Sequence, residues 1–165
     1  MEEIEMKKRM VLAAVMISLG TLVFANAPAA SDTAVINLSG VIEPKVVITA
    51  DVEDVELNLM ADAGDIVIAT LTEWSNVRAG YEVSLGSTGN GRLVNTADDS
   101  EFLPYTVSYG GVTRDLSNGT VVVTDSESKS VGQGTDKALG ISFTANGDLG
   151  DGLYTDSLTF TITAK

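Results

Sequence analysis

The chain of 165 residues carries 23 acidic and 10 basic side chains, a formal net charge of −13, and contains neither cysteine nor histidine. This charge balance disfavours a nucleic-acid partner, because phosphates are bound by clustered Lys and Arg side chains. The missing residue types exclude disulfides, a cysteine nucleophile, the commonest general base and the usual zinc ligands. We therefore expect a fold held together by packing and strand hydrogen bonds.

Residues 1–29 have the three parts of an export signal. Lys7, Lys8 and Arg9 form a positive region, residues 10–24 form an apolar run, and residues 25–29 ("ANAPA") are small. The apolar run is short for a helix that must cross about 30 Å of hydrocarbon, which disfavours the alternative of a retained membrane anchor. We predict a signal peptide at 1–29, export, and a mature chain that begins near Ala30.

The remainder of the chain has the length of one domain and shows no helical spacing of apolar residues. Short β-branched runs recur, separated by Gly, Asn, Asp and Ser, which is typical of a β-sandwich or β-barrel. We therefore predict an all-β fold. The predicted strands are 34–42, 46–52, 55–60, 65–71, 81–86, 105–109, 120–124, 138–145 and 157–164.

The last two predicted strands alternate strictly between apolar and polar residues. In 157–164, one face carries threonines and the other carries Leu158, Phe160 and Ile162, as in a strand with one face in the core. Residues 138–145 ("ALGISFTA") repeat this alternation. Because the glycine-rich "NGDLGDG" (146–152) lies between them, we predict that the two strands form a hairpin.

Acidic side chains are the remaining candidates for chemistry. Glycosidases pair two carboxylates in a cleft that binds sugar, but only 5% of the residues are aromatic and could stack on one. Three oxygen-bearing side chains in the turn 146–152 could bind Ca²⁺, although the turn is shorter than an EF-hand loop and lacks its closing acid; they are Asn146, Asp148 and Asp151. We interpret this segment as a plain turn, and we predict no catalytic, metal or cofactor site.

Three segments together resemble the pilin subunits of chaperone–usher fimbriae. An alternating opening, "TAVINLSGVIEP" (33–44), runs into "KVVITADVEDVELNL" (45–59), and the middle carries "LPYTVSYGG" (103–111). The chain closes with "GLYTDSLTFTIT" (152–163), a Gly-x-Tyr-x-Asp pattern followed by alternating apolar residues, which is also found in spore-coat-U-type domains. In lacking cysteine, the chain is closer to the colonisation-factor and archaic-type pilins than to the branch that has a disulfide.

The resemblance implies an immunoglobulin-like β-sandwich, residues 45–165, which lacks its final strand and is completed by donor-strand exchange. A periplasmic chaperone fills the open groove first, and the N-terminal extension of the next identical or related subunit then replaces it. With an outer-membrane usher, this gives a homopolymer at the cell surface. Residues 30–44 are the implied donor extension, with an inserted face formed by Ile36, Leu38, Gly40 and Ile42. The implied acceptor groove is lined in part by Leu158, Phe160 and Ile162.

Two alternatives remain open from the sequence. Residues 34–42 could pair within their own domain, as the first strand of a self-contained secreted or surface sandwich. The chain could also be a carbohydrate- or host-binding adhesin domain, although its single tryptophan and few other aromatics disfavour this function. Gly40 has a different meaning under the two strand hypotheses. In a strand that pairs within its own domain, a glycine weakens the strand because it has no side chain to pack. In a donor strand, it would face a shallow part of the neighbour's groove.

Overall fold

The structure is a computed structural model that describes residues 31–165. The predicted signal peptide, residues 1–29, lies outside the described residues. The chain divides into two units, residues 1–40 and 41–165. In the first unit, residues 31–40 are exposed and form no strand. Across residues 31–165 there is no helix that is long and apolar enough to cross a membrane.

The second unit is built from strands, which confirms the predicted all-β fold. No helix occurs in the described part of the chain, and every strand pairing is antiparallel. The strands are β1 (Val46–Ala50), β2 (Ala63–Ser75), β3 (Tyr81–Ser87), β4 (Arg92–Asn95), β5 (Phe102–Pro104), β6 (Thr106–Tyr109), β7 (Val112–Arg114), β8 (Val121–Ser126), β9 (Thr135–Phe143), β10 (Tyr154–Thr155) and β11 (Leu158–Ala164).

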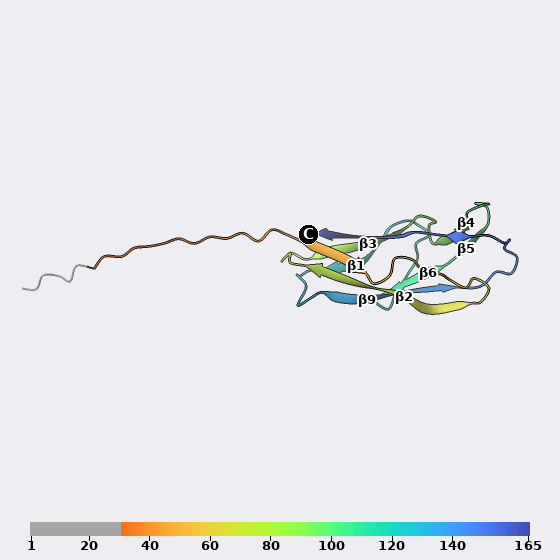
Figure 1. Cartoon of the computed structure of the whole chain (residues 1–165), viewed down its shortest axis with the longest axis horizontal. Helices are drawn as coiled ribbons and strands as arrows, with labels where there is room; N and C mark the ends of the chain where they lie inside the picture. Colours follow the sequence, from red (N-terminus) through yellow and green to blue (C-terminus); the bar gives the residue numbers. More distant parts are fainter. Residues whose placement is uncertain (1–30) are drawn as a thin grey trace, which may run out of the picture. The chain divides into compact units, whose positions relative to one another are not determined.

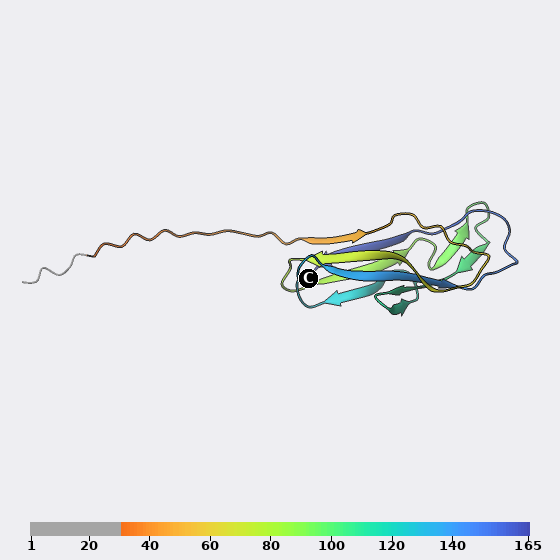
Figure 2. The ribbon, with the colours of Figure 1, turned by 60° about the horizontal axis from the view of Figure 1, so that its bottom comes forward.

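The strands form three sheets. The largest has the order β1-β2-β9-β6-β7, the second has the order β11-β3-β8, and a small one has the order β10-β4-β5. Figures 1 and 2 show the two larger sheets as layers that lie over one another, with β4 and β5 at one end. Neighbours in space are often distant in sequence, because β2 pairs with β9 and β3 pairs with β11.

The core lies between the two larger sheets and follows the period-2 alternation of their strands. In β3, the side chains of Tyr81, Val83 and Leu85 are buried, whereas those of Glu82 and Ser84 are only half-buried. The facing sheet contributes further buried apolar side chains from β2, β6 and β9, namely Leu71, Val107, Leu139 and Ile141. Alternation along the sequence therefore determines which face of each sheet meets the other.

Two of the predicted strands are absent. Residues 34–42 form no strand, because no segment of the described chain pairs with them. Residues 55–60 also form none, since the backbone turns at Leu59 and Met60 and the Asn58 side chain accepts the Met60 N–H at 3.1 Å. Leu57 and Leu59 still pack against the core. The apolar alternation in this segment therefore reflects side chains with which a loop packs on the core.

The predicted hairpin between the last two long strands is also wrong. β9 lies between β2 and β6 in the five-stranded sheet, whereas β11 pairs with β3 in the other sheet. Both strands turn an apolar face to the same core from opposite layers. The intervening residues 144–157, which include β10, therefore cross from one layer to the other.

Four short strands were not predicted: β4, β5, β7 and β10. They have between two and four residues, too few for alternation to stand out. The β6–β7 hairpin has a local signal, because Gly110 and Gly111 form its two-residue turn with positive φ angles of 57° and 81°. Such a turn requires φ > 0 at both central residues, which glycine adopts without strain.

Candidate functional site

Two strands at the same side of the domain have a free edge. β11 pairs with β3 alone, from Leu158 opposite Ser87 to Ala164 opposite Tyr81. β1 pairs with β2 alone, from Val46 opposite Ser75 to Ala50 opposite Leu71. One row of backbone N–H and C=O groups on each strand therefore has no strand partner within the described chain, and such rows can pair with an added strand.

β1 and β11 are neighbours although they belong to different sheets. No hydrogen-bond ladder joins them, and their inward side chains are only partly buried. These apolar side chains pack against the core from the two strands: Val46, Ile48, Leu158, Phe160 and Ile162. We call this the edge groove. The three predicted residues of β11 thus lie on one face, beside β1.

Sequence reasoning missed the β1 side of the edge groove. Val46 and Ile48 are two residues apart, so alternation places them on one face of the strand. The same pattern could have placed both side chains on an inward face, but only the order of the strands shows that β11 lies beside β1. The outward threonines of β11, at 159, 161 and 163, are exposed.

Phe160 links the edge groove to the interior. Its ring lies 5.4 Å, centroid to centroid, from the ring of Tyr109 on β6, at an interplanar angle of 34°. The hydroxyl of Tyr109 donates a hydrogen bond of 2.6 Å to Glu73 Oε1. A single aromatic contact therefore connects the free edge with a polar cluster in the core.

The polar cluster is centred on Glu73 of β2, whose residue surface is 0% exposed. Besides Tyr109, Thr124 Oγ1 donates to Oε1 at 2.8 Å and the Tyr81 hydroxyl donates to Oε2 at 3.2 Å. Burial, followed by the hydrogen bond and charge of Glu73, raises the pKa of Tyr109 above its ordinary value of 10. Because its members come from β2, β3, β6 and β8, the cluster ties the two larger sheets together. Sequence reasoning missed it, since a glutamate is by default expected in water.

A second polar cluster holds the residues of the closing Gly-x-Tyr-x-Asp pattern. Asp156 Oδ2 accepts hydrogen bonds from Ser87 Oγ, at 2.5 Å, and from the Tyr105 hydroxyl. Its Oδ1 accepts the Gly89 N–H at 2.7 Å. Burial, and then the hydrogen bond to Asp156, raises the pKa of Tyr105. Asp156 therefore fixes the point at which the chain enters β11, which gives this part of the pattern a structural role.

Tyr154 and Gly152 of the same pattern contact the small sheet. The Tyr154 hydroxyl donates to Glu101 Oε2 at 2.9 Å. A Cβ atom on Gly152 would lie 2.8 Å from Asn95 Nδ2, so the backbone approaches Asn95 too closely for a larger residue. Both contacts hold the loop that precedes β11 against β4 and the β4–β5 connection.

The predicted donor residues lie in the described part of the N-terminal segment. Ile36, Leu38 and Ile42 are 83%, 91% and 87% exposed, and nothing lies within 4 Å of the Cβ position of Gly40. Large exposed apolar side chains gathered in one short segment form a candidate contact surface.

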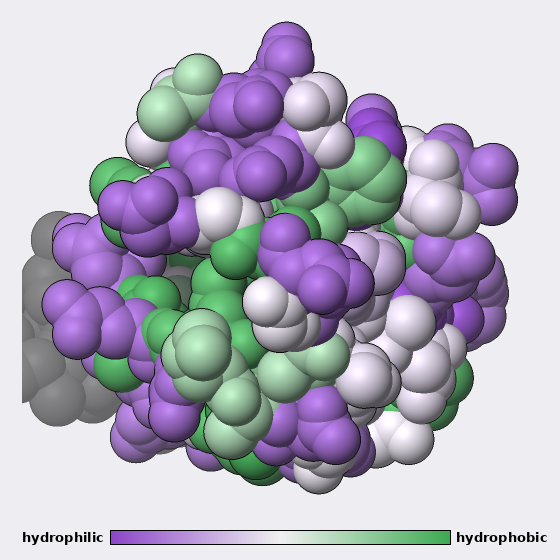
Figure 3. Space-filling view, turned by 90° about the vertical axis from the view of Figure 1, so that its right-hand side faces the viewer, coloured by the Kyte–Doolittle hydropathy of each residue, from purple (hydrophilic) through white to green (hydrophobic). Residues whose placement is uncertain are grey.

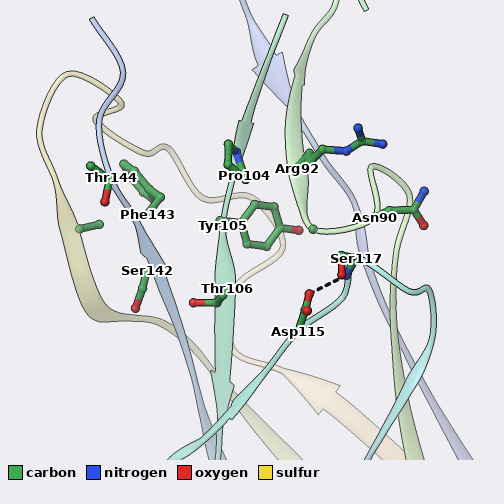
Figure 4. Close-up of a pocket in the computed structure, with 12 residues that line it drawn as sticks. Asn90, Arg92, Pro104, Tyr105, Thr106, Asp115, Ser117, Ser142, Phe143 and Thr144 are labelled. Atoms are coloured by element: carbon green, nitrogen blue, oxygen red, sulfur yellow. Dashed lines mark hydrogen bonds between the residues drawn. The ribbon is translucent and has the colours of Figure 1, made fainter. Parts of the chain in front are cut away.

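One open pocket of about 780 Å³ lies away from the edge groove, between the β3–β4 turn and the start of β6. Figure 4 shows Tyr105 at its centre, with Phe143 to one side and the Arg92 side chain turned away. Asp115 on its wall accepts the Ser117 N–H at 2.8 Å. None of the predicted donor or groove residues lines this pocket.

The turn that could have bound Ca²⁺ is closed by its own hydrogen bonds. The Asp148 N–H donates to Asn146 Oδ1 at 3.1 Å, and the Leu149 N–H donates to the Asn146 carbonyl at 3.4 Å. Within residues 31–165, no three or more His, Cys, Asp or Glu side chains gather to hold a metal ion. The segment therefore forms a hydrogen-bonded turn, as predicted.

Comparison with protein-family models found no match to the chain, and comparison with curated proteins found none either.

Proposed function

We propose that this protein is a structural subunit of a surface fimbria and that its subunits join by strand insertion. In this proposal the domain is an immunoglobulin-like sandwich without its last strand, and residues 30–44 of one copy enter the edge groove of the next. The observation that carries the proposal is the match between two unsatisfied features. One is an exposed apolar segment without a strand partner, and the other is a pair of free strand edges lined by half-buried apolar side chains.

The energetics favour such a joint. Burying Ile36, Leu38 and Ile42 would contribute about 1.5–3 kcal/mol for each side chain. An inserted strand would also satisfy the free N–H and C=O groups of β11, which otherwise face water or a second partner. Main-chain hydrogen bonds give affinity in this mode of binding, and side-chain pockets give register.

The same features require protection before assembly. An apolar segment and an open sheet edge in one monomer are an aggregation hazard. We therefore include in the proposal export by the signal peptide, a periplasmic chaperone that covers the edge groove in transit, and an outer-membrane usher that releases the subunit to the surface polymer. The alternative of a self-contained sandwich is not favoured, because residues 34–42 form no strand within the described chain.

The proposal is tested by removing residues 33–43 from the full exported chain, which leaves the predicted cleavage site in place. Cells that produce the intact chain should yield surface extracts that run as ladders on SDS gels and collapse to monomer on boiling. The shortened chain should yield monomer alone. Ladders from the shortened chain would show that another segment joins the subunits.

The shortened chain also allows a direct binding test. A peptide of residues 30–43 should bind it and raise its unfolding temperature, whereas a peptide of the same composition in scrambled order should not. A self-contained sandwich would instead be destabilised by the deletion and would not respond to either peptide.

A further inference from the structure

The exposed charges of the folded unit are distributed unequally between its two ends. We define the loop end as residues 58–62, 96–101 and 144–153. These segments contact one another, because the Ala145 N–H donates to Asp62 Oδ1 at 2.8 Å and the Gly150 N–H donates to Glu101 Oε2 at 3.2 Å. They contain six carboxylates and no Lys or Arg; the acids are Asp62, Asp98, Asp99, Glu101, Asp148 and Asp151.

The loop end also presents exposed apolar side chains. Met60 and Leu153 are 84% and 65% exposed. Figure 3 looks onto this end and shows hydrophobic patches surrounded by hydrophilic residues. An apolar centre with a charged rim is the usual anatomy of a contact surface between proteins.

The opposite end is mixed in sign. We define the turn end as Lys45, residues 76–80, residues 126–131 and Lys165. Hydrogen bonds join these parts: the Lys45 N–H donates to Asn76 Oδ1 at 2.7 Å, and the Lys165 N–H donates to the Gly80 carbonyl at 3.2 Å. The turn end holds four of the seven basic residues found after position 30, namely Lys45, Arg78, Lys129 and Lys165.

Three of these bases are available to a partner. Lys165 forms ion pairs with Asp125 and Glu127. Lys45, Arg78 and Lys129 are exposed and form no ion pair with any residue that the structure describes. Val131, which is 87% exposed, adds an apolar side chain to the same end.

We propose that the loop end of one copy docks on the turn end of the next copy, as an electrostatic contact that accompanies strand insertion. The inference rests on the proposed function and adds the surface that orients the partner. Five of the six loop-end carboxylates are exposed, all but that of Glu101, so contact between two loop ends would place ten exposed carboxylates against one another. Such like-charge contact selects against the wrong orientation, whereas loop end on turn end brings acids to unpaired bases.

The path of the chain leads to the same contact. β11 begins near the loop end, where the Thr96 N–H donates to the Leu153 carbonyl at 2.8 Å, and it ends beside Gly80 at the turn end. A segment inserted antiparallel to β11 leaves the groove at the loop end. The next residues of that copy are its own Lys45 and turn end, which are thereby delivered to the loop end of the acceptor.

Insertion parallel to β11 has a different consequence. The segment would leave the groove at the turn end and bring two turn ends together. Both copies could then exchange segments and close into a dimer, with no free groove for a third. The charge distribution therefore selects antiparallel insertion and an open polymer.

The test reverses charge at each end in the full chain. The loop-end variant carries Asp99→Lys, Asp148→Lys and Asp151→Lys, and the turn-end variant carries Lys45→Glu, Arg78→Glu and Lys129→Glu. None of these six side chains forms a hydrogen bond or ion pair with another described residue, so the fold should tolerate both sets. Monomer recovered from the export compartment is then followed as it forms SDS-stable ladders.

Each variant alone should join about ten-fold more slowly than the natural chain at low salt, and salt near 0.5 M should remove the difference. The chain that carries both sets should recover a rate close to that of the natural chain. The loop-end variant also separates the proposed contact from a general effect of net charge. Its three Asp→Lys substitutions make the chain less negative, so if only net charge mattered, this variant would join faster than the natural chain.

If the natural chain forms ladders and both variants join at the same rate as it does, the proposed contact is wrong and the proposed function is unaffected. Slow joining by the chain that carries both sets would also overturn the contact. Absence of ladders from the natural chain would remove the proposed function, and the contact with it.

Discussion

The Tyr109 hydroxyl donates a hydrogen bond of 2.6 Å to the carboxylate of Glu73, a residue with no exposed surface. Among the described residues, no basic side chain forms an ion pair with this carboxylate. The carboxylate instead accepts hydrogen bonds from the hydroxyls of Tyr81, Tyr109 and Thr124, which come from both larger sheets. The chain has no cysteine, so this cluster links the two layers by hydrogen bonds and not by a disulfide.

Replacing Glu73 should destabilise the domain strongly. In Glu73→Ala, two buried tyrosine hydroxyls and the half-buried Thr124 hydroxyl lose their acceptor. We expect the free energy of unfolding to fall by about 2–5 kcal/mol. Denaturant unfolding followed by the fluorescence of Trp74, the single tryptophan, measures this change. The control is Glu82→Ala on the outward side of β3, for which a change within about 0.5 kcal/mol is expected. Equal effects of the two substitutions would contradict a special role for the cluster.

The buried tyrosines should make the domain sensitive to high pH. The pKa of Tyr105 and that of Tyr109 are both raised from their ordinary value of 10, mainly by burial. Above pH 10 the unfolded chain therefore loses these protons more readily than the folded domain. The stability contributed by each tyrosine is complete below that pH and is lost as the pH rises further, by up to about 1.4 kcal/mol for each pH unit. Urea unfolding between pH 8 and pH 11 measures this slope, and Tyr109→Phe should make it shallower. An unchanged slope in the Tyr105→Phe, Tyr109→Phe double variant would contradict this assignment.

Asp156 should be the most sensitive residue of the closing pattern. Asp156→Ala leaves Ser87, Tyr105 and the Gly89 N–H without their acceptor, and we expect a loss of about 2–4 kcal/mol in the free energy of unfolding. Asp151→Ala in the preceding loop is the matched control, because that exposed side chain forms no hydrogen bond with another described residue. The prediction is wrong if thermal unfolding of the two variants occurs at the same temperature.

Gly40→Leu should block subunit joining and leave the folded domain unchanged. In the proposed donor strand, Gly40 shares the inserted face with Leu38 and Ile42, and a leucine there would overpack the groove. We expect SDS-stable ladders to fall by about ten-fold or more, with no change in the unfolding temperature of the domain. Ser39→Leu places the same side chain on the opposite face and should assemble normally. Ladders of natural length from Gly40→Leu would exclude the proposed register.

Alternation predicted that each long strand exists, although β2 (Ala63–Ser75) extends beyond the predicted 65–71 and β9 (Thr135–Phe143) begins before the predicted 138–145. The period-2 pattern of 157–164 predicts which side chains of β11 face inward, and Leu158, Phe160 and Ile162 are indeed its half-buried residues. β3 and β8 were also predicted close to their observed bounds. These strands have one buried face, so their register is strongly specified by the sequence. The role of the edge groove in joining remains a prediction.

Alternation failed to predict the features that are determined by which other segment a stretch of chain contacts. Residues 34–42 alternate as a strand should, yet strand structure requires a neighbouring strand, and none is present in the described chain. The hairpin prediction failed for a related reason, because local alternation does not say which of two sheets a strand joins. Glu73 lies two residues after Leu71 on the inward face of β2, so its position was readable from the sequence. The sequence did not show that the Glu73 carboxylate would be buried, because the hydroxyls that bind it come from three other strands.

The pairing of β3 with β11 has a consequence for the order of folding. It joins Tyr81 to Ala164, so the loop that must be closed spans most of the domain. Pairings this distant in sequence close slowly, because the entropy of ordering the intervening chain is lost before the contact is gained. Because the chain is synthesised from its N-terminus, β3 is made early, and one of its edges has no partner until the last residues of the chain follow. The edge of β3 that β11 covers in the folded domain is therefore exposed for longest while the chain is being made.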